Sequence, residues 1–137
     1  MEITYILLAL FFCHFLADYT HLSTPWMLNA KRLGKPLYPI FVHALIHATL
    51  MGLCLEIYGY YYLGTHPFRW EISVIDELFL FQLITHFLID VWKGRMNGWF
   101  PALQSPANKW HWIVFGLDQF FHAVVIIIMV HYLQNPV

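Results

Sequence analysis

The sequence predicts an all-α fold: a four-helix transmembrane bundle built from two repeated helical hairpins. Three observations lead to this prediction. Of the 137 residues, 60% are hydrophobic and 11% are charged, whereas about a quarter are charged in a typical soluble domain. Four long apolar segments alternate with polar loops that contain prolines. A motif of histidine and aspartate recurs in the two halves of the chain.

The four apolar segments are each close to the roughly 20 residues that a helix needs to cross a bilayer. We expect spans at about 3–21, 38–62, 72–92 and 112–132, all within a single integral membrane domain covering residues 1–137. Pro36, Pro67 and Pro106 fall between these segments, where a missing N–H does not interrupt a helix. Because lipid offers the backbone no hydrogen-bond partners, each segment should be helical.

The basic residues predict how the chain is oriented. Six of the seven lie in the first loop, or in the third loop and the end of the third span: Lys31, Arg32, Lys35, Lys93, Arg95 and Lys109. The second loop and both termini hold only Arg69. Because cytoplasmic loops are enriched in lysine and arginine, we expect loops one and three in the cytoplasm and both termini outside. The expected location is a bacterial inner membrane.

Composition and charge also limit the partners. The low charged fraction excludes a soluble globular enzyme and a disordered tail. A net charge of -1 gives no positive field for a phosphate backbone, so no nucleic acid is expected. Membrane lipid is the expected partner, and the sequence leaves open a homo-oligomer or a partner subunit that completes the site.

Each predicted span carries one pair of histidine or aspartate side chains four residues apart. The pairs are His14/Asp18, His43/His47, His86/Asp90 and Asp118/His122. This spacing places both side chains of a pair on one helix face. An aspartate at mid-span costs about 2.5–3.5 kcal/mol on insertion scales, so its presence indicates function. In the predicted orientation all eight lie in the cytoplasmic half, with the histidines at 14, 47, 86 and 122 one turn deeper than the other four.

The pairs also reveal an internal repeat. Residues 14–18 read HFLAD and residues 86–90 read HFLID, while the pair in the second span corresponds to the pair in the fourth. The two hairpins would have the same orientation, so a pseudo-two-fold axis along the membrane normal should relate them. That symmetry would place the four pairs around one axis.

Five imidazoles and three carboxylates inside lipid need a compensating charge, which a divalent metal supplies. Zinc is the expected ion, with iron or manganese as alternatives, and eight ligands suit two ions better than one. Gln82, Gln119, His21 and His111 are candidates to orient these ligands from a second layer. The alternative without metal is a polar core in which the same groups join the helices by hydrogen bonds.

Several motifs together resemble a family of short bacterial multi-span membrane proteins known only as a domain of unknown function. They are His14-Phe15-Leu16-Ala17-Asp18-Tyr19, Trp26-Met27 with Asn29 and Lys31, His43 to His47, Thr85 to Asp90, and Asp118-Gln119 to His122. The resemblance covers nearly the whole chain and implies a multi-span helical membrane protein, but no activity. The pattern is also loosely similar to that of inner-membrane metal-dependent hydrolases.

The leading hypothesis is a membrane-embedded, di-metal hydrolase that acts on a lipid or another membrane-delivered substrate near the cytoplasmic leaflet, because bound metal makes hydroxide available at neutral pH. A transporter of divalent metal or protons is the first alternative. The apolar outer halves of the first and fourth spans, at 6–12 and 123–130, argue against a continuous pathway. A haem-binding electron-transfer bundle, with axial ligands from the deeper histidines, is the second alternative.

Overall fold

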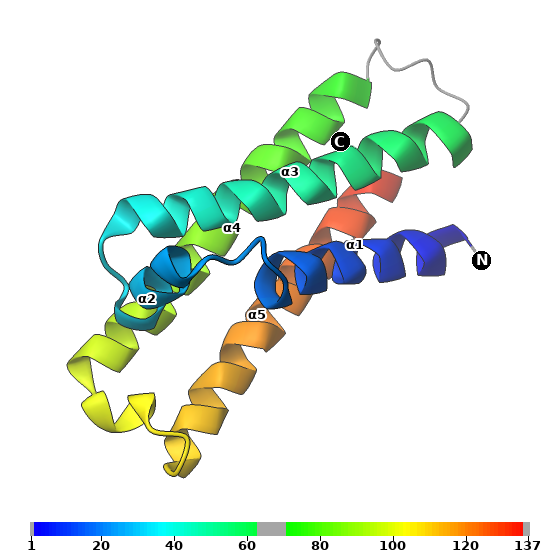
Figure 1. Cartoon of the computed structure of the whole chain (residues 1–137). Helices are drawn as coiled ribbons and strands as arrows, with labels where there is room; N and C mark the ends of the chain where they lie inside the picture. Colours follow the sequence, from blue (N-terminus) through cyan, green and yellow to red (C-terminus); the bar gives the residue numbers. More distant parts are fainter. Residues whose placement is uncertain (1, 63–70, 136–137) are drawn as a thin grey trace.

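The fold is all-α over residues 2–62 and 71–135, which are the residues that the computed structural model describes. The elements, shown in Figure 1, are α1 (Glu2–Tyr19), α2 (Pro25–Leu33), α3 (Leu37–Tyr62), α4 (Glu71–Trp99), the short 3-10 helix η1 (Pro101–Gln104) and α5 (Lys109–Gln134). The predicted helical class is confirmed. Arg69, which entered the charge count above, lies outside the described residues.

Four long helices coincide with the four predicted spans, but they differ in how apolar they are. Two of the described helices, Leu37–Tyr61 and Lys109–Gln134, are long and apolar enough to cross a membrane, and Ile3–Tyr19 is a shorter apolar helix. Helix α4 runs on to Trp99 instead of ending near 92, because the next proline is Pro101. Its charged residues at both ends make it the least apolar of the four.

The prediction of four helices is wrong by one, because the first loop folds into α2. The Thr24 hydroxyl accepts a hydrogen bond from the N–H of Met27, and Pro25 occupies the first turn, where its missing N–H costs nothing. Gly34 ends the helix in the left-handed conformation, with φ of 64°, and its N–H bonds to the carbonyl of Ala30. These start and stop signals lie in the loop predicted between the first two spans.

The long helices form a closed ring. Helix α1 packs against α3 and α5, and α4 packs against the same two helices, so α1 lies across the ring from α4 and α3 lies across from α5. Helix α2 packs against α3 and α4, and η1 packs against α4 and α5 (Figure 1). The short elements therefore gather at the end of the bundle where α1 ends and α3 begins.

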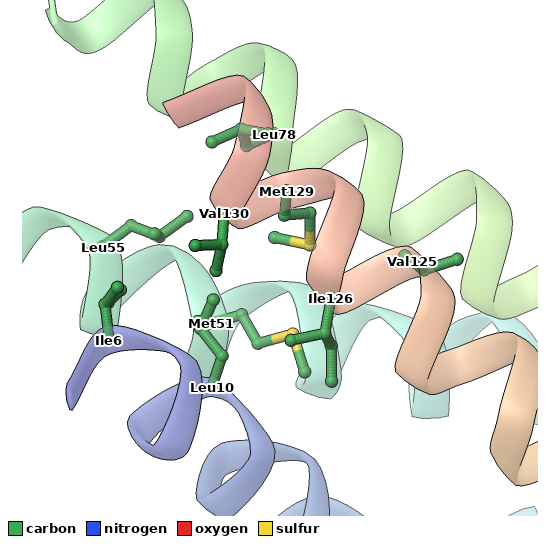
Figure 2. Close-up of a cluster of buried hydrophobic side chains, with 9 residues drawn as sticks. All are labelled: Ile6, Leu10, Met51, Leu55, Leu78, Val125, Ile126, Met129 and Val130. Carbon is green, nitrogen blue, oxygen red and sulfur yellow. The ribbon is translucent and has the colours of Figure 1, made fainter. Parts of the chain in front are cut away.

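One inward-facing stripe on each long helix lines the ring. On α1 the stripe is Ile6, Leu10, His14 and Asp18, at intervals of one helical turn. The half of the ring away from α2 is filled by apolar side chains from all four long helices (Figure 2): Ile6, Leu10, Met51, Leu55, Leu78, Val125, Ile126, Met129 and Val130. The polar pairs occupy the other half, so each stripe changes from apolar to polar partway along its helix.

Two glycines let α2 lie directly on α4. A Cβ on Gly94 would come within 2.1 Å of the backbone nitrogen of Gly34 and 2.5 Å of the carbonyl oxygen of Lys31. A Cβ on Gly34 would come within 2.6 Å of the backbone nitrogen of Arg95. Backbone therefore touches backbone at this crossing, and no larger residue fits at either position. This close contact fixes the position of α2 relative to α4, and with it the position of the α2 side chains that point toward the ring.

Candidate metal centre

The structure brings all eight predicted ligands together inside the ring. Seven of them are buried, with at most 7% of the residue exposed: His14, His43, His47, His86, Asp90, Asp118 and His122. The eighth, Asp18, has a side chain that is 8% exposed. Each long helix contributes its pair, as the i, i+4 spacing predicts. We refer to these eight side chains as the His/Asp cluster.

The deeper histidines contact one another across the ring. The ring centroids of His47 and His86 are 3.7 Å apart, and those of His86 and His122 are 4.2 Å apart. His14 lies 4.8 Å from His47 and 5.0 Å from His122 by the same measure. Four helices thus place four imidazoles in direct contact, which requires that most of these rings be uncharged or share an anionic partner.

The three carboxylates provide those anionic partners. Oδ2 of Asp90 lies 3.2 Å from Nε2 of His86, and its Oδ1 lies 3.6 Å from Nε2 of His122. Oδ1 of Asp18 lies 3.1 Å from Nε2 of His43. Asp90, on α4, is fully buried and links the other two carboxylates through shared partners. Lys31 contacts both Asp90 and Asp18, and His122 contacts both Asp90 and Asp118.

Two lysines enter the cluster, and the sequence reasoning did not assign either of them to it. The ammonium of Lys31 lies 3.0 Å from Asp18 Oδ1, 3.2 Å from Asp90 Oδ1 and 2.8 Å from Nε2 of His43. The ammonium of Lys93 lies 2.6 Å from Asp118 Oδ2. Burial disfavours the charged form of Lys31, but Asp90 and Asp18 outweigh burial and hold the pKa of Lys31 above its ordinary value.

The sequence contains a spacing that indicates the position of each lysine. Lys93 follows Asp90 by three residues, which places it on the same face of α4 as the predicted pair. Lys31 follows the buried Met27 by four residues, so once 25–33 is read as a helix, the lysine lies on its inner face. His21 follows Asp18 by three residues, as Lys93 follows Asp90, yet it lies beyond the end of α1 and is exposed.

Two of the other predicted second-layer residues, Gln82 and Gln119, contact the cluster. The Gln82 amide nitrogen is 3.5 Å from Nδ1 of His86, and the Gln119 amide donates to Asp118 Oδ2 at 3.2 Å. His111 lies outside the ring and donates from Nδ1 to the carbonyl of Leu103 at 2.6 Å. Ser23 was not predicted, and its buried hydroxyl lies 3.2 Å from Nδ1 of His43.

The cluster has more hydrogen-bonding capacity than its own members can satisfy. Among the described residues, ten buried side-chain nitrogen and oxygen atoms lack a hydrogen bond, and nine of them belong to the cluster; the tenth is on Gln82. Both oxygens of Asp90, Oδ1 of Asp118 and both ring nitrogens of His122 are among the nine. Several of these atoms still lie close to a group of opposite charge, as Asp90 Oδ1 lies 3.2 Å from Lys31 and Oδ2 lies 3.2 Å from His86, but they make no hydrogen bond. Buried polar atoms without hydrogen bonds are costly, so their concentration at one place favours a further, shared partner.

A metal ion fits this arrangement. Three sets of ligand atoms lie within 4.8 Å of one another: Asp18 with His43, His47 and His86; His14 with His86 and His122; and Asp90 with Asp118 and His122. Imidazole nitrogen and carboxylate oxygen are ordinary ligands of first-row divalent ions, and both bind in their unprotonated forms. The buried His/Asp groups can therefore bind a metal ion, although they do not specify which one.

The sequence of the chain matches one known protein family over most of its length. Residues 6–137 match the family described as "Protein of unknown function (DUF3307)". The chain belongs to this family. The match covers nearly the whole chain, as the resemblance noted from the motifs implies. Comparison of this DUF3307 chain with curated proteins and with solved structures found no match.

Proposed function

We propose that the chain is an integral membrane protein whose four long helices all cross the bilayer. The outer surface of the ring supports this. Large apolar side chains at mid-helix are each at least half exposed: Leu8, Phe12, Leu53, Ile57, Leu80, Ile84 and Ile127. A surface that is apolar around a polar interior suits lipid as the surrounding solvent and does not suit water.

We propose the orientation with both termini outside the cytoplasm, in a bacterial inner membrane. The contact between α2 and α4 brings the basic residues of the first loop to the same end of the bundle as Lys93 and Arg95. Asp76 and Glu77 are exposed near the opposite end of α4. The positive-inside rule counts lysine and arginine, and their concentration at the α2 end of the bundle supports a cytoplasmic position for that end.

We propose that the His/Asp cluster binds a divalent ion, with zinc first and iron or manganese as alternatives. The observation that carries this proposal is the set of nine buried cluster atoms without a hydrogen bond. Asp90, Asp118 and His122 would hold the ion, because this set joins two carboxylates to an imidazole and leaves five atoms without a hydrogen bond. Lys93 contacts the other oxygen of Asp118, so Oδ1 stays available.

Charge favours one ion and not the two that eight ligands suggest. The three carboxylates face two ammonium groups, which leaves one negative charge uncompensated if the imidazoles are neutral. One divalent ion reverses this to a single positive charge, which a hydroxide or an anionic substrate balances. A second ion would leave a larger positive charge in a buried site. We propose that Lys31, which contacts Asp18, Asp90 and His43, takes the place of the second cation.

We propose that this centre hydrolyses a lipid or another membrane-delivered substrate near the cytoplasmic leaflet. A divalent ion polarises a substrate oxygen and lowers the pKa of water, so water can attack at neutral pH. None of the eight cluster residues is a hydroxyl or thiol nucleophile. Ser23 bonds His43 and thereby orients the ring, which directs Nε2 toward Asp18.

Two other functions fit the structure less well. A transporter needs a polar path through the bundle, but the apolar side chains in Figure 2 fill the ring beyond the deeper histidines. A haem needs a slot for the porphyrin between its axial ligands. The ring centroids of His47 and His86 are 3.7 Å apart, and those of His86 and His122 are 4.2 Å apart, which leaves no slot for a porphyrin between these rings.

Hydrolysis in isotopically labelled water tests this function. The full chain is reconstituted with bacterial lipids and zinc in water enriched in oxygen-18, and the products are examined by mass spectrometry. We expect lipid products that carry oxygen-18 and that disappear in Asp118→Asn, while Asp76→Asn retains them. Products without the isotope, or equal activity in Asp118→Asn, would contradict the proposal.

A further inference from the structure

A cavity at the α2 end of the bundle reaches the cluster. It has a volume of about 300 Å³, and its wall includes Asp18 and Asp118, two of the three cluster carboxylates. Helices α1, α2, α4 and α5 all contribute to the wall. A molecule in this cavity would therefore contact the outer side of the cluster, next to Asp118, where we place the metal ion.

The wall of the cavity carries three basic side chains. They are Lys31 and Arg32 from α2 and Lys93 from α4, and His111 and the amides of Asn97 and Gln119 also line the wall. His111 donates through Nδ1 to a backbone carbonyl, so its Nε2 carries the lone pair in the neutral ring. The three cations offset the three cluster carboxylates in number, and a divalent ion would then leave two positive charges.

That excess of charge is matched by a phosphate group. A phosphate monoester carries up to two negative charges, and arginine and lysine are the side chains that recognise phosphate best. Lys31 and Lys93 each contact a cluster carboxylate and also line the cavity. If a metal ion bound Asp118, the pull of this carboxylate on Lys93 would weaken, and the ammonium of Lys93 would become available to an anion.

The rest of the wall is apolar. Tyr19, Leu28 and Phe115 line it, and Lys93 lies over the ring of Phe115 at 4.9 Å from its centroid. Tyr19 and Leu28 are also about half exposed on the outer surface, which continues into the apolar surface of α1. A soluble anion has no apolar group to pack against these side chains, whereas the glycerol and first acyl carbons of a lipid would pack against them.

From these observations we propose that the cavity binds the phosphate group of an anionic phospholipid and that the bound metal ion strengthens this binding. The inference rests on the proposed function, because it names the substrate class of the same centre. Arg32 is the residue that tests it best. It is exposed and lines the cavity, so its substitution should not disturb the fold or the cluster.

The experiment measures binding by calorimetry on the full chain in detergent, loaded with zinc and freed of excess ion. The probes are dihexanoylphosphatidic acid, dihexanoylphosphatidylcholine and inorganic phosphate. We expect phosphatidic acid to bind at least tenfold more tightly than the other two. Removal of the zinc should weaken it by a similar factor. Arg32→Gln should weaken it about tenfold, which corresponds to about 1.4 kcal/mol.

The matched control is Arg95→Gln, because Arg95 is an exposed arginine on α4 that does not line the cavity. It should bind phosphatidic acid like the unmodified chain. Equal loss in both variants, or equal binding of phosphatidylcholine, would overturn the proposal. Equal binding of inorganic phosphate would overturn the lipid part and assign the cavity to a soluble anion.

The same samples separate this inference from the proposed function. If isotope-labelled products form with zinc but phosphatidic acid shows no preference, the cavity assignment fails and the hydrolase survives. If the chain binds phosphatidic acid tightly but retains no metal by elemental analysis, the hydrolase fails and the anion site survives.

Discussion

Gly94→Ala should push α2 away from α4 and lower the free energy of unfolding of the protein. The new Cβ would lie 2.1 Å from the backbone nitrogen of Gly34 and 2.5 Å from the carbonyl oxygen of Lys31. Ordinary contacts between non-bonded atoms are about 3.5–4.0 Å, so α2 must move by roughly 1.5 Å. Because the clashing atoms are backbone, no side-chain rotation relieves the overlap. Lys31 would move with α2, away from its two carboxylates.

The magnitude follows from two opposing effects. Overpacking costs about 1–3 kcal/mol, or more where the backbone must move. Replacing glycine by alanine inside a helix returns about 1 kcal/mol. Because backbone must move here, the overpacking cost lies in the upper part of its range, about 2–3 kcal/mol. We therefore expect a net loss of roughly 1–2 kcal/mol in the free energy of unfolding, and a melting temperature lower by several degrees.

Gly116→Ala is the matched control, because this glycine lies in α5 and nothing lies within 4 Å of the Cβ it would gain. It should be as stable as the unmodified chain, or more stable by up to about 1 kcal/mol. The assay is thermal unfolding in detergent, followed by far-ultraviolet circular dichroism. If Gly94→Ala melts at or above the temperature of Gly116→Ala, the close crossing of α2 and α4 does not exist as described.

Three further predictions concern the cluster. A chelator should lower the melting temperature of the unmodified chain, because metal at a hundredfold excess over its dissociation constant stabilises the folded state by about 2.7 kcal/mol. In Asp118→Asn the chelator should have no effect on the melting temperature. Lys31→Met should increase the metal content of the purified protein above that of the unmodified chain, because it removes the internal cation between Asp18 and Asp90; an unchanged or lower content would contradict the role given to Lys31. Met129→Ala should cost about 2–5 kcal/mol in a melting experiment, because Met129 is fully buried, yet leave the metal content unchanged, since the apolar half of the ring does not hold the ion.

The helices and the cluster could be predicted because one periodic signal specifies both. An i, i+4 pair such as His86/Asp90 fixes the face of its helix, and an apolar span fixes the helix itself. In one small bundle, four such polar faces can be buried together only at the centre of the bundle. The convergence of the eight side chains therefore follows from spacing and burial cost alone, without knowledge of loop structure.

The loops could not be predicted in the same way, and they hold the residues that the sequence analysis missed. Hydropathy treats 25–33 as a polar connection, but Thr24 and Gly34 define a helix there, and only this helix brings Lys31 to Asp90. The contact depends on a glycine pair more than fifty residues apart in the chain, which no local pattern reveals. Lys31 contacts two of the three cluster carboxylates, which is why we propose that it replaces the second cation expected from the ligand count.

Elemental analysis of the detergent-purified chain, beside Asp118→Asn, tests the central claim most directly. The account predicts about one divalent ion per chain in the unmodified protein, retained through gel filtration, and little in the variant. A metal content near zero in both, with unchanged stability, would show that the eight side chains form a polar core held by hydrogen bonds and lysines alone.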